Sequence, residues 1–179
     1  ITPKIIPPDL KELNFTLEPK TAHMILTNRK TSGKYLYNVL SGQNRLFDEG
    51  GAILFGETRL HYQDIPFDFV YVCHPHDFTT EIKARDLLYF FNQSLGKSKN
   101  DWKDTWKRLK LSKIGNCKIK ELEPETTAQV LLEAARLKNP AICMVNDITK
   151  GLATNSALNI FKELEEMKER GTSFLYISN

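Results

Sequence analysis

The chain has 179 residues, of which 41% are hydrophobic and 26% are charged, and its formal net charge is +3. This profile fits one ordinary globular domain, and so small a charge does not by itself indicate a nucleic-acid or membrane partner. The three cysteines lie far apart without a CxxC pair, which argues against a disulfide framework and a zinc site. No apolar run approaches the roughly 20 residues that span a bilayer, and no signal peptide opens the chain, so we expect a reducing, aqueous compartment.

Short apolar runs bounded by polar or turn residues predict strands at 21–26, 52–55, 69–73, 141–145 and 173–178. The last two runs are nearly continuous in apolar residues, which suits parallel strands buried on both faces. Helical periodicity predicts helices at 127–138, ended by Asn139-Pro140, and at 155–170, stopped by Gly171. Strand, helix and strand over 141–178 form a βαβ unit, whose crossover should be right-handed. The chain is therefore expected to be an α/β domain.

The middle of the chain has a different pattern. Residues 80–95 and 101–111 both read as helices, with no strand between them. We interpret about 79–120 as a helical subdomain inserted into the α/β core of one domain, 1–179.

A candidate phosphate-binding loop follows the first predicted strand. Such a loop needs a strand, a glycine-rich turn and a helix start, where backbone N–H groups and a lysine surround the phosphates. Gly33-Lys34 stands where this motif ends, but Asn28 replaces its first glycine and Tyr35 replaces its Ser/Thr. A Gly-Lys pair at a strand–helix junction often arises by chance, so this motif alone is a weak indication.

The order and spacing of the remaining segments resemble the ABC transporter ATPase family. The matching segments are a hairpin region at 40–56, the strand entering the Q-loop at 69–74, the opening of the helical subdomain at 79–91, the signature region at 122–126, the Walker B strand at 141–147, the D-loop at 149–153 and the switch strand at 171–179. The resemblance covers nearly the whole chain, from about Leu10 to Asn179. It implies a P-loop NTPase fold of the ABC ATPase type with an inserted helical subdomain.

The same resemblance implies a set of nucleotide-binding positions. They are Asn28, Ser32, Gly33, Lys34, Tyr35, Leu36, His74, Asn146, Asp147 and Asn179. His74 stands for the usual glutamine, and Asn179 for the usual histidine. Asn146 stands for the aspartate that organises Mg²⁺, and Asp147 for the catalytic glutamate.

These replacements predict impaired chemistry. Gly33 and Lys34 are compatible with binding ATP, whereas Tyr35 and Asn146 together remove the usual support for Mg²⁺. Phosphoryl transfer depends almost wholly on positioning and charge stabilisation. Asp147 is the one candidate catalytic residue, and it is a methylene shorter than glutamate. In an alternative register Asp147 organises the metal and Ile148 replaces the catalytic acid, which leaves the site defective as well.

The signature region would also be a poor partner for a triphosphate. In an ABC dimer this region completes the site of the other subunit, and here Glu123-Pro124-Glu125 would bring two negative charges to it. The resemblance therefore implies a degenerate, non-catalytic or weakly catalytic ATP-binding subunit, peripheral on the cytoplasmic face of a membrane. It would pair with a membrane-spanning transporter subunit and with an ABC ATPase partner or its own copy, and no nucleic acid is expected.

Two alternatives remain open at this point. The chain could be a slow but active ABC ATPase that uses Lys34 and Asp147, or a scaffold that uses its basic segment 97–120 for an interaction. This segment contains nine basic residues and only two acidic ones, and Trp102 and Trp106 lie one helical turn apart. It could contact anionic lipid headgroups, nucleic acid or a membrane-domain helix, or be a solvated amphipathic helix whose tryptophans pack on the subdomain.

Overall fold

The structure is a computed structural model that describes residues 14–27, 35, 36, 38, 69–78 and 80–178, and the backbone of 53–55 and 58–60. A parallel sheet lies at its centre. Across this sheet the strands are β1 (Ala22–Leu26), β6 (Ser173–Ser178), β5 (Ile142–Asn146) and β4 (Phe69–Val72). A separate antiparallel pair joins β2 (Ile53–Phe55) and β3 (Thr58–Leu60). All five expected strands are present, and β3 is an addition to them.

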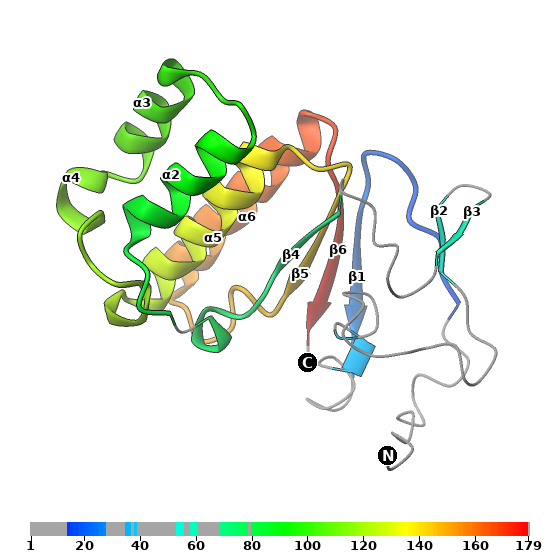
Figure 1. Cartoon of the computed structure of the whole chain (residues 1–179). Helices are drawn as coiled ribbons and strands as arrows, with labels where there is room; N and C mark the ends of the chain where they lie inside the picture. The colour runs from blue at the N-terminus through cyan, green and yellow to red at the C-terminus, as the bar shows by residue number, and fades with distance from the viewer. Residues whose placement is uncertain are drawn as a thin grey trace, which may run out of the picture.

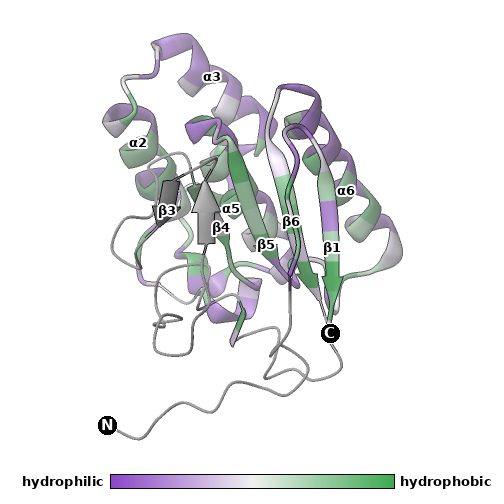
Figure 2. Cartoon of the chain, turned by 90° about the vertical axis from the view of Figure 1, so that its right-hand side faces the viewer, coloured by the Kyte–Doolittle hydropathy of each residue, from purple (hydrophilic) through white to green (hydrophobic). Residues whose placement is uncertain are grey.

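The burial of the strands follows their positions in the sheet. β5 and β6 are buried along nearly their whole length, as expected for parallel strands covered on both faces. In Figure 2, β5 is largely hydrophobic, whereas the outer helix α3 (Lys99–Arg108) is largely hydrophilic. β1 alternates instead, with Met24 and Leu26 exposed on one face. Both runs that were predicted to be strands buried on two faces, at 141–145 and 173–178, are confirmed as such.

The helices pack in two layers beside the sheet. They are α2 (Ala84–Ser94), α3, α4 (Leu111–Ile114), α5 (Pro124–Lys138) and α6 (Thr154–Glu169), with short 3₁₀ turns η3 (Pro75–Asp77) and η4 (Ile119–Glu121). Figure 1 shows α5 and α6 next to the sheet, with α2, α3 and α4 outside them. Within the described ranges, no helix combines the length and apolar character needed to cross a bilayer.

Local backbone chemistry sets the helix boundaries. α5 begins earlier than the predicted 127, because Pro124 occupies its first turn, where a missing N–H costs nothing. Ser98 begins α3 with a capping box, in which its hydroxyl accepts from the N–H of Asp101 (3.2 Å). Lys110 adopts a left-handed backbone (φ 50°), so the helix predicted at 101–111 divides into α3 and α4. α6 agrees closely with its predicted range.

Helix α5 is shared by two hydrophobic clusters. Facing the sheet, Ala128, Leu131, Leu132 and Ala135 pack with residues of β4, β5, β6 and α6. Facing the outer helices, Val130, Ala134 and Leu137 pack with residues of α2, α4 and η4. Because one helix contributes to both clusters, we expect the outer helices and the sheet to unfold together.

A buried carboxylate joins α5 to α3. Glu133 is only 2% exposed, and it accepts hydrogen bonds from the Thr105 hydroxyl (2.7 Å) and from Nε of Arg136 (2.7 Å). Nε of Arg108 lies 3.5 Å from the same carboxylate, and Nη1 of Arg108 lies 3.9 Å from Glu166 of α6. The charge of Glu133 is therefore paired from two sides, as a buried charge requires.

Glu163 of α6 makes this cluster sensitive to pH. Burial raises its pKa to about 7, with Glu133 and Glu166 raising it further and Arg108 and Arg136 opposing them. A raised carboxyl pKa means that the folded state binds the proton more tightly. This contribution to stability is complete below pH 4.5 and is lost as the pH rises through about 7.

We therefore expect Glu163→Gln to be more stable than the parent chain at pH 8, by about 1 kcal/mol after allowance for partial solvent screening. At pH 4.5 the two proteins should have nearly equal free energies of unfolding, measured by urea denaturation. Glu169→Gln, at an exposed position of the same helix, is the control and should stay within about 0.5 kcal/mol of the parent at both pH values. A Glu163→Gln variant that is less stable at pH 8 would contradict the assignment.

Candidate functional site

The carboxyl ends of the four parallel strands meet at one edge of the sheet. Ligands of open α/β sheets bind in the crevice outside such an edge. β5 ends at Asn146 and is followed by Asp147, and β4 leads through Cys73 to His74. Strands β4 and β5 are neighbours (Figure 1), so three of the predicted site residues come to this edge: Asn146 at the end of β5, Asp147 just after it, and His74 after β4.

Asp147 is held firmly at this edge. It is buried, and its backbone is left-handed (φ 47°), a conformation that Asp tolerates better than most residues. Its N–H donates to the carbonyl oxygen of Ile177 (3.0 Å), and its Oδ1 accepts from the Ser178 hydroxyl (2.7 Å). Its Oδ2 lies 3.9 Å from Nζ of Lys150. The one candidate catalytic carboxylate is therefore engaged with the end of β6 and with its own loop.

The carbonyl of Ser178 also ties β1 to β6. It accepts hydrogen bonds from the N–H of Thr27 (2.9 Å) and from the Thr27 hydroxyl (3.2 Å). A continuous polar chain of Thr27, Ser178 and Asp147 thus closes the ends of three strands. Sequence reasoning missed Thr27 and Ser178. The signal was a hydroxyl residue just after the strand predicted at 21–26 and at the end of the strand predicted at 173–178.

The loop after Asp147 is fastened to the sheet by a tyrosine. The hydroxyls of Thr149 and Tyr176 are 2.6 Å apart, and the N–H of Thr149 donates to the same phenol oxygen (3.3 Å). Burial raises the pKa of Tyr176, although its hydrogen bonds with Thr149 oppose the shift. Gly151 has a φ of +79°, which favours glycine at this turn. The loop at 147–153 therefore has a defined shape.

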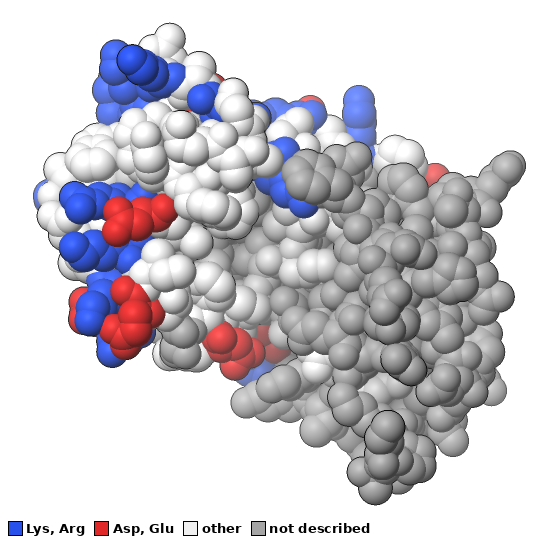
Figure 3. All heavy atoms as spheres, viewed as in Figure 1, with Lys and Arg blue, Asp and Glu red and all other residues white. Residues whose placement is uncertain are grey.

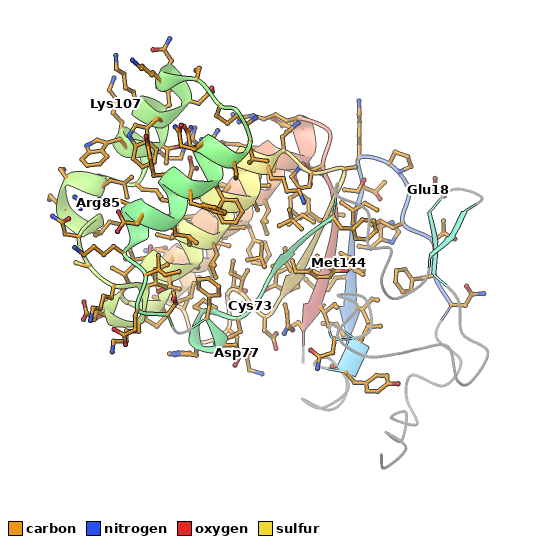
Figure 4. All side chains as sticks on the ribbon, in the orientation of Figure 1. Glu18, Cys73, Asp77, Arg85, Lys107 and Met144 are labelled. Carbon is orange, nitrogen blue, oxygen red and sulfur yellow. The ribbon has the colours of Figure 1, made fainter. Side chains whose placement is uncertain are left out.

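His74 acts locally as a cap. Its Nδ1 accepts from the N–H of His76 (3.2 Å) at the start of η3, and the two rings stack with centroids 5.2 Å apart. Figure 4 shows Cys73 and, below it, Asp77 of this turn near the lower end of β4. Burial and then the charge of Asp77 raise the pKa of Cys73 to about 11, so its sulfur is a thiol at neutral pH.

Comparisons with known proteins agree with this architecture. No protein-family model matches the chain. The chain is 22% identical over 191 residues to the ribose import ATP-binding protein RbsA of Halalkalibacterium halodurans, an alignment that covers 96% of the chain and 37% of the relative. An ATP binding subunit of an ABC transporter superposes with a TM-score of 0.72 at 15% identity, covering 92% of this chain and 70% of that one. The protein cbiO1 of Clostridium perfringens, part of the ABC transporter complex cbiONQ, superposes with a TM-score of 0.70 at 14% identity, covering 93% and 70%.

The chain has the fold of an ABC ATPase domain. The resemblance inferred from the sequence is confirmed, and so is the α/β fold class. The chain spans 37% of the length of RbsA, so the activity of that whole protein does not transfer to it directly.

Only part of the expected ABC nucleotide site lies in the described residues. Tyr35 and Leu36 are in a helical turn after β1, and Leu36 is buried against Met144, Leu175 and Ile177. Leu36 therefore anchors this turn to the sheet. The other predicted positions, Asn28, Ser32, Gly33, Lys34 and Asn179, lie outside the described residues.

The region matching the ABC signature is acidic in the structure as well as in the sequence. Glu123 precedes the first turn of α5, and Pro124 and Glu125 lie within it. A helix N-terminus carries a partial positive charge that can attract phosphate, and carboxylates placed there compensate it. Glu125 also accepts a hydrogen bond from the Ser156 hydroxyl (2.6 Å), which links the start of α5 to α6.

The described part of the edge offers few ligands to a Mg²⁺ ion. This ion requires oxygen ligands in near-octahedral geometry. Asn146, at the metal-organising position, offers a neutral amide, and the neighbouring carboxylate of Asp147 already contacts Ser178 and Lys150. Among the residues with described side chains, no group of three His, Cys, Asp or Glu could hold a metal ion.

Proposed function

We propose that the chain is a degenerate ATP-binding subunit of an ABC transporter complex, non-catalytic or only weakly catalytic. The observation that carries this proposal is the engagement of Asp147. Its Oδ1 accepts a hydrogen bond from the Ser178 hydroxyl (2.7 Å), and the side chain of the adjacent Asn146 is neutral. An ABC fold is thus combined with an edge that lacks the usual pair of carboxylates.

The chemistry of the edge supports weak or absent hydrolysis. A general base must lie within hydrogen-bond reach of the proton that it removes, directly or through one water. Asp147 has a short side chain, and its position is fixed by contacts with β6 and with Lys150. A water at Oδ1 would compete with the Ser178 hydroxyl, and Oδ2 lies 3.9 Å from Nζ of Lys150. Binding and hydrolysis are therefore separable in this proposal, with binding assigned to Gly33 and Lys34.

The proposed partners are a membrane-spanning subunit and an ABC ATPase subunit, either a different protein or a second copy. cbiO1, which superposes on the chain, is part of an ABC transporter complex. We place the chain on the cytoplasmic face of the membrane, in contact with the transporter through the helices α2–α4. The acidic start of α5 makes it a poor contributor to a partner's nucleotide site.

Calorimetric titration of ATP into the purified chain tests the proposal, with Lys34→Ala as the control. Heat of binding that disappears in Lys34→Ala, without turnover, is the expected result. Turnover that Lys34→Ala removes would favour the slow ATPase. An absence of binding at millimolar ATP would leave the fold as a scaffold and contradict the nucleotide-binding role.

A further inference from the structure

The helical layer carries a set of lysines that form no ion pair with other residues described in the structure. Of the nine basic residues at 97–120, Lys118 and Lys120 contact Glu81, and Arg108 contacts Glu133 and Glu166. The rest form no salt bridge with any described residue: Lys97, Lys99, Lys103, Lys107, Lys110 and Lys113. Figure 3 shows basic groups gathered over α3 at the upper end of the molecule. Most of this charge faces solvent.

Helix α3 separates its basic and acidic residues. Each residue of a helix is rotated by about 100° around the helix axis relative to the one before it. Lys99, Lys103 and Trp106 therefore lie on one stripe of α3, about 60° wide. Asp101 and Asp104 fall on the other side, where both raise the pKa of the partly buried Arg136. Both acidic residues are exposed but act on Arg136, and the stripe of Lys99, Lys103 and Trp106 contains no acidic residue. In Figure 4, Lys107 extends from the outer side of α3, away from the sheet.

An aromatic ridge runs beside this positive stripe. Tyr89 of α2 contacts Trp102 edge-on, with ring centroids 5.3 Å apart, and Trp102 contacts Trp106 in the same way at 6.0 Å. Tyr89 is 50% exposed and Trp106 is 37% exposed, whereas Trp102 packs partly against the core of the helical layer. The ridge thus has two exposed aromatic residues, Tyr89 and Trp106, joined by Trp102, which packs on the helical layer.

We propose that this α2–α3 surface, formed by Tyr89, Lys99, Trp102, Lys103, Trp106 and Lys107, binds the anionic headgroups of a lipid bilayer. Lysines attract an anionic leaflet, and tyrosine and tryptophan settle where one end of the ring is apolar and the other is wet. The two features lie side by side on one face. This inference rests on the proposed function, which brings the domain to a membrane, and it assigns the transporter contact to the parts of α2–α4 outside this surface.

The aromatic geometry favours lipid over single-stranded nucleic acid. A nucleic-acid platform needs open ring faces on which bases can stack. Here Trp102 is half-buried, and it meets both Tyr89 and Trp106 at steep angles (74° and 65°), so the three rings do not form a set of parallel open faces. Exposed aromatic residues with lysine neighbours are suited to an interface between headgroups and water.

Vesicle binding tests the proposal on the whole 179-residue chain without nucleotide. Vesicles of phosphatidylcholine, with or without phosphatidylserine, are mixed with the chain and sedimented. Trp102 and Trp106 are the only tryptophans of the chain, so a shift of tryptophan emission reports on this surface alone. Quenching by lipids with brominated acyl chains measures whether the rings enter the bilayer.

We expect binding to vesicles with phosphatidylserine, weakened by salt, with a blue shift of the emission. Replacing Lys99, Lys103 and Lys107 by Gln should lower the partition coefficient about 100-fold, at roughly tenfold or less for each lysine. The matched control replaces Lys162 and Lys168 of α6 and its C-cap Arg170 by Gln. It removes the same charge and should leave binding nearly unchanged.

Equal loss of binding in both triple variants would overturn the proposal, because it would show a response to net charge only. The proposal would also be overturned if the chain did not bind vesicles, or if it bound a single-stranded oligonucleotide in preference to them. ATP titration of the Lys99, Lys103 and Lys107 variant separates this inference from the proposed function. Unchanged ATP binding with lost vesicle binding is the expected combination, and failure of ATP binding in the parent chain would count against the proposed function alone.

Discussion

Glu133→Ala is expected to lower the free energy of unfolding by about 3–5 kcal/mol, the range found when one member of a buried ion pair is removed. The Glu133 side chain is almost fully buried and receives hydrogen bonds from Thr105 and Arg136. Its loss leaves Arg136 half-buried without its carboxylate and leaves the buried Thr105 hydroxyl without its acceptor. Urea denaturation at neutral pH gives the measurement.

Glu166→Ala is the matched control for this prediction. Glu166 also faces Arg108, at 3.9 Å, but its side chain is 55% exposed. Exposed pairs contribute little, so the variant should stay within about 0.5 kcal/mol of the parent. A cost below 1 kcal/mol for Glu133→Ala would mean that water replaces the carboxylate, and the connection between α3 and α5 would then be much looser than described.

Leu88→Ala should cost about 3 kcal/mol, because it leaves a cavity in the cluster between α2 and α5. Leu88 is fully buried, and it packs in the cluster to which Val130, Ala134 and Leu137 of α5 belong. These α5 residues lie on the same helix as Leu132, which packs toward the sheet. The loss at Leu88 should therefore lower the stability of the whole fold rather than loosen the outer helices alone.

Two probes distinguish these outcomes. Tryptophan fluorescence follows the helical layer, because both tryptophans lie in α3, and far-ultraviolet circular dichroism follows the whole chain. We expect the unfolding midpoints measured by fluorescence and by circular dichroism to coincide, and to shift by the same amount in Leu88→Ala. Leu158→Ala, at a position that is 53% exposed, should shift neither by much. A fluorescence midpoint that moves alone would show that the helical layer unfolds independently.

The sequence predicted the fold well where patterns are local. Continuous apolar runs identified β5 and β6 as doubly buried strands, and the three- and four-residue spacing identified α6. Boundaries that depend on a single backbone conformation were harder. Nothing in the residue type required the left-handed Lys110 that separates α3 from α4.

The site was predictable only in part, because its contacts join residues far apart in the chain. Segment order identified Asn146 and Asp147 at a strand end, but the bond between Ser178 and Asp147 joins residues 31 positions apart. Glu133 resembled an ordinary charged residue of a helix. Its burial depends on Thr105, 28 positions away, and only the neighbouring Arg136 was visible at helical spacing.

The central claim is that this ABC ATPase fold combines nucleotide binding with the loss of metal-dependent hydrolysis. Calorimetric titration of ATP in the presence of Mg²⁺, and again with a chelator, tests it most directly. We predict weak binding of similar affinity under both conditions, lost in Lys34→Ala and without release of phosphate. Binding that requires Mg²⁺ and is followed by steady turnover would contradict the claim.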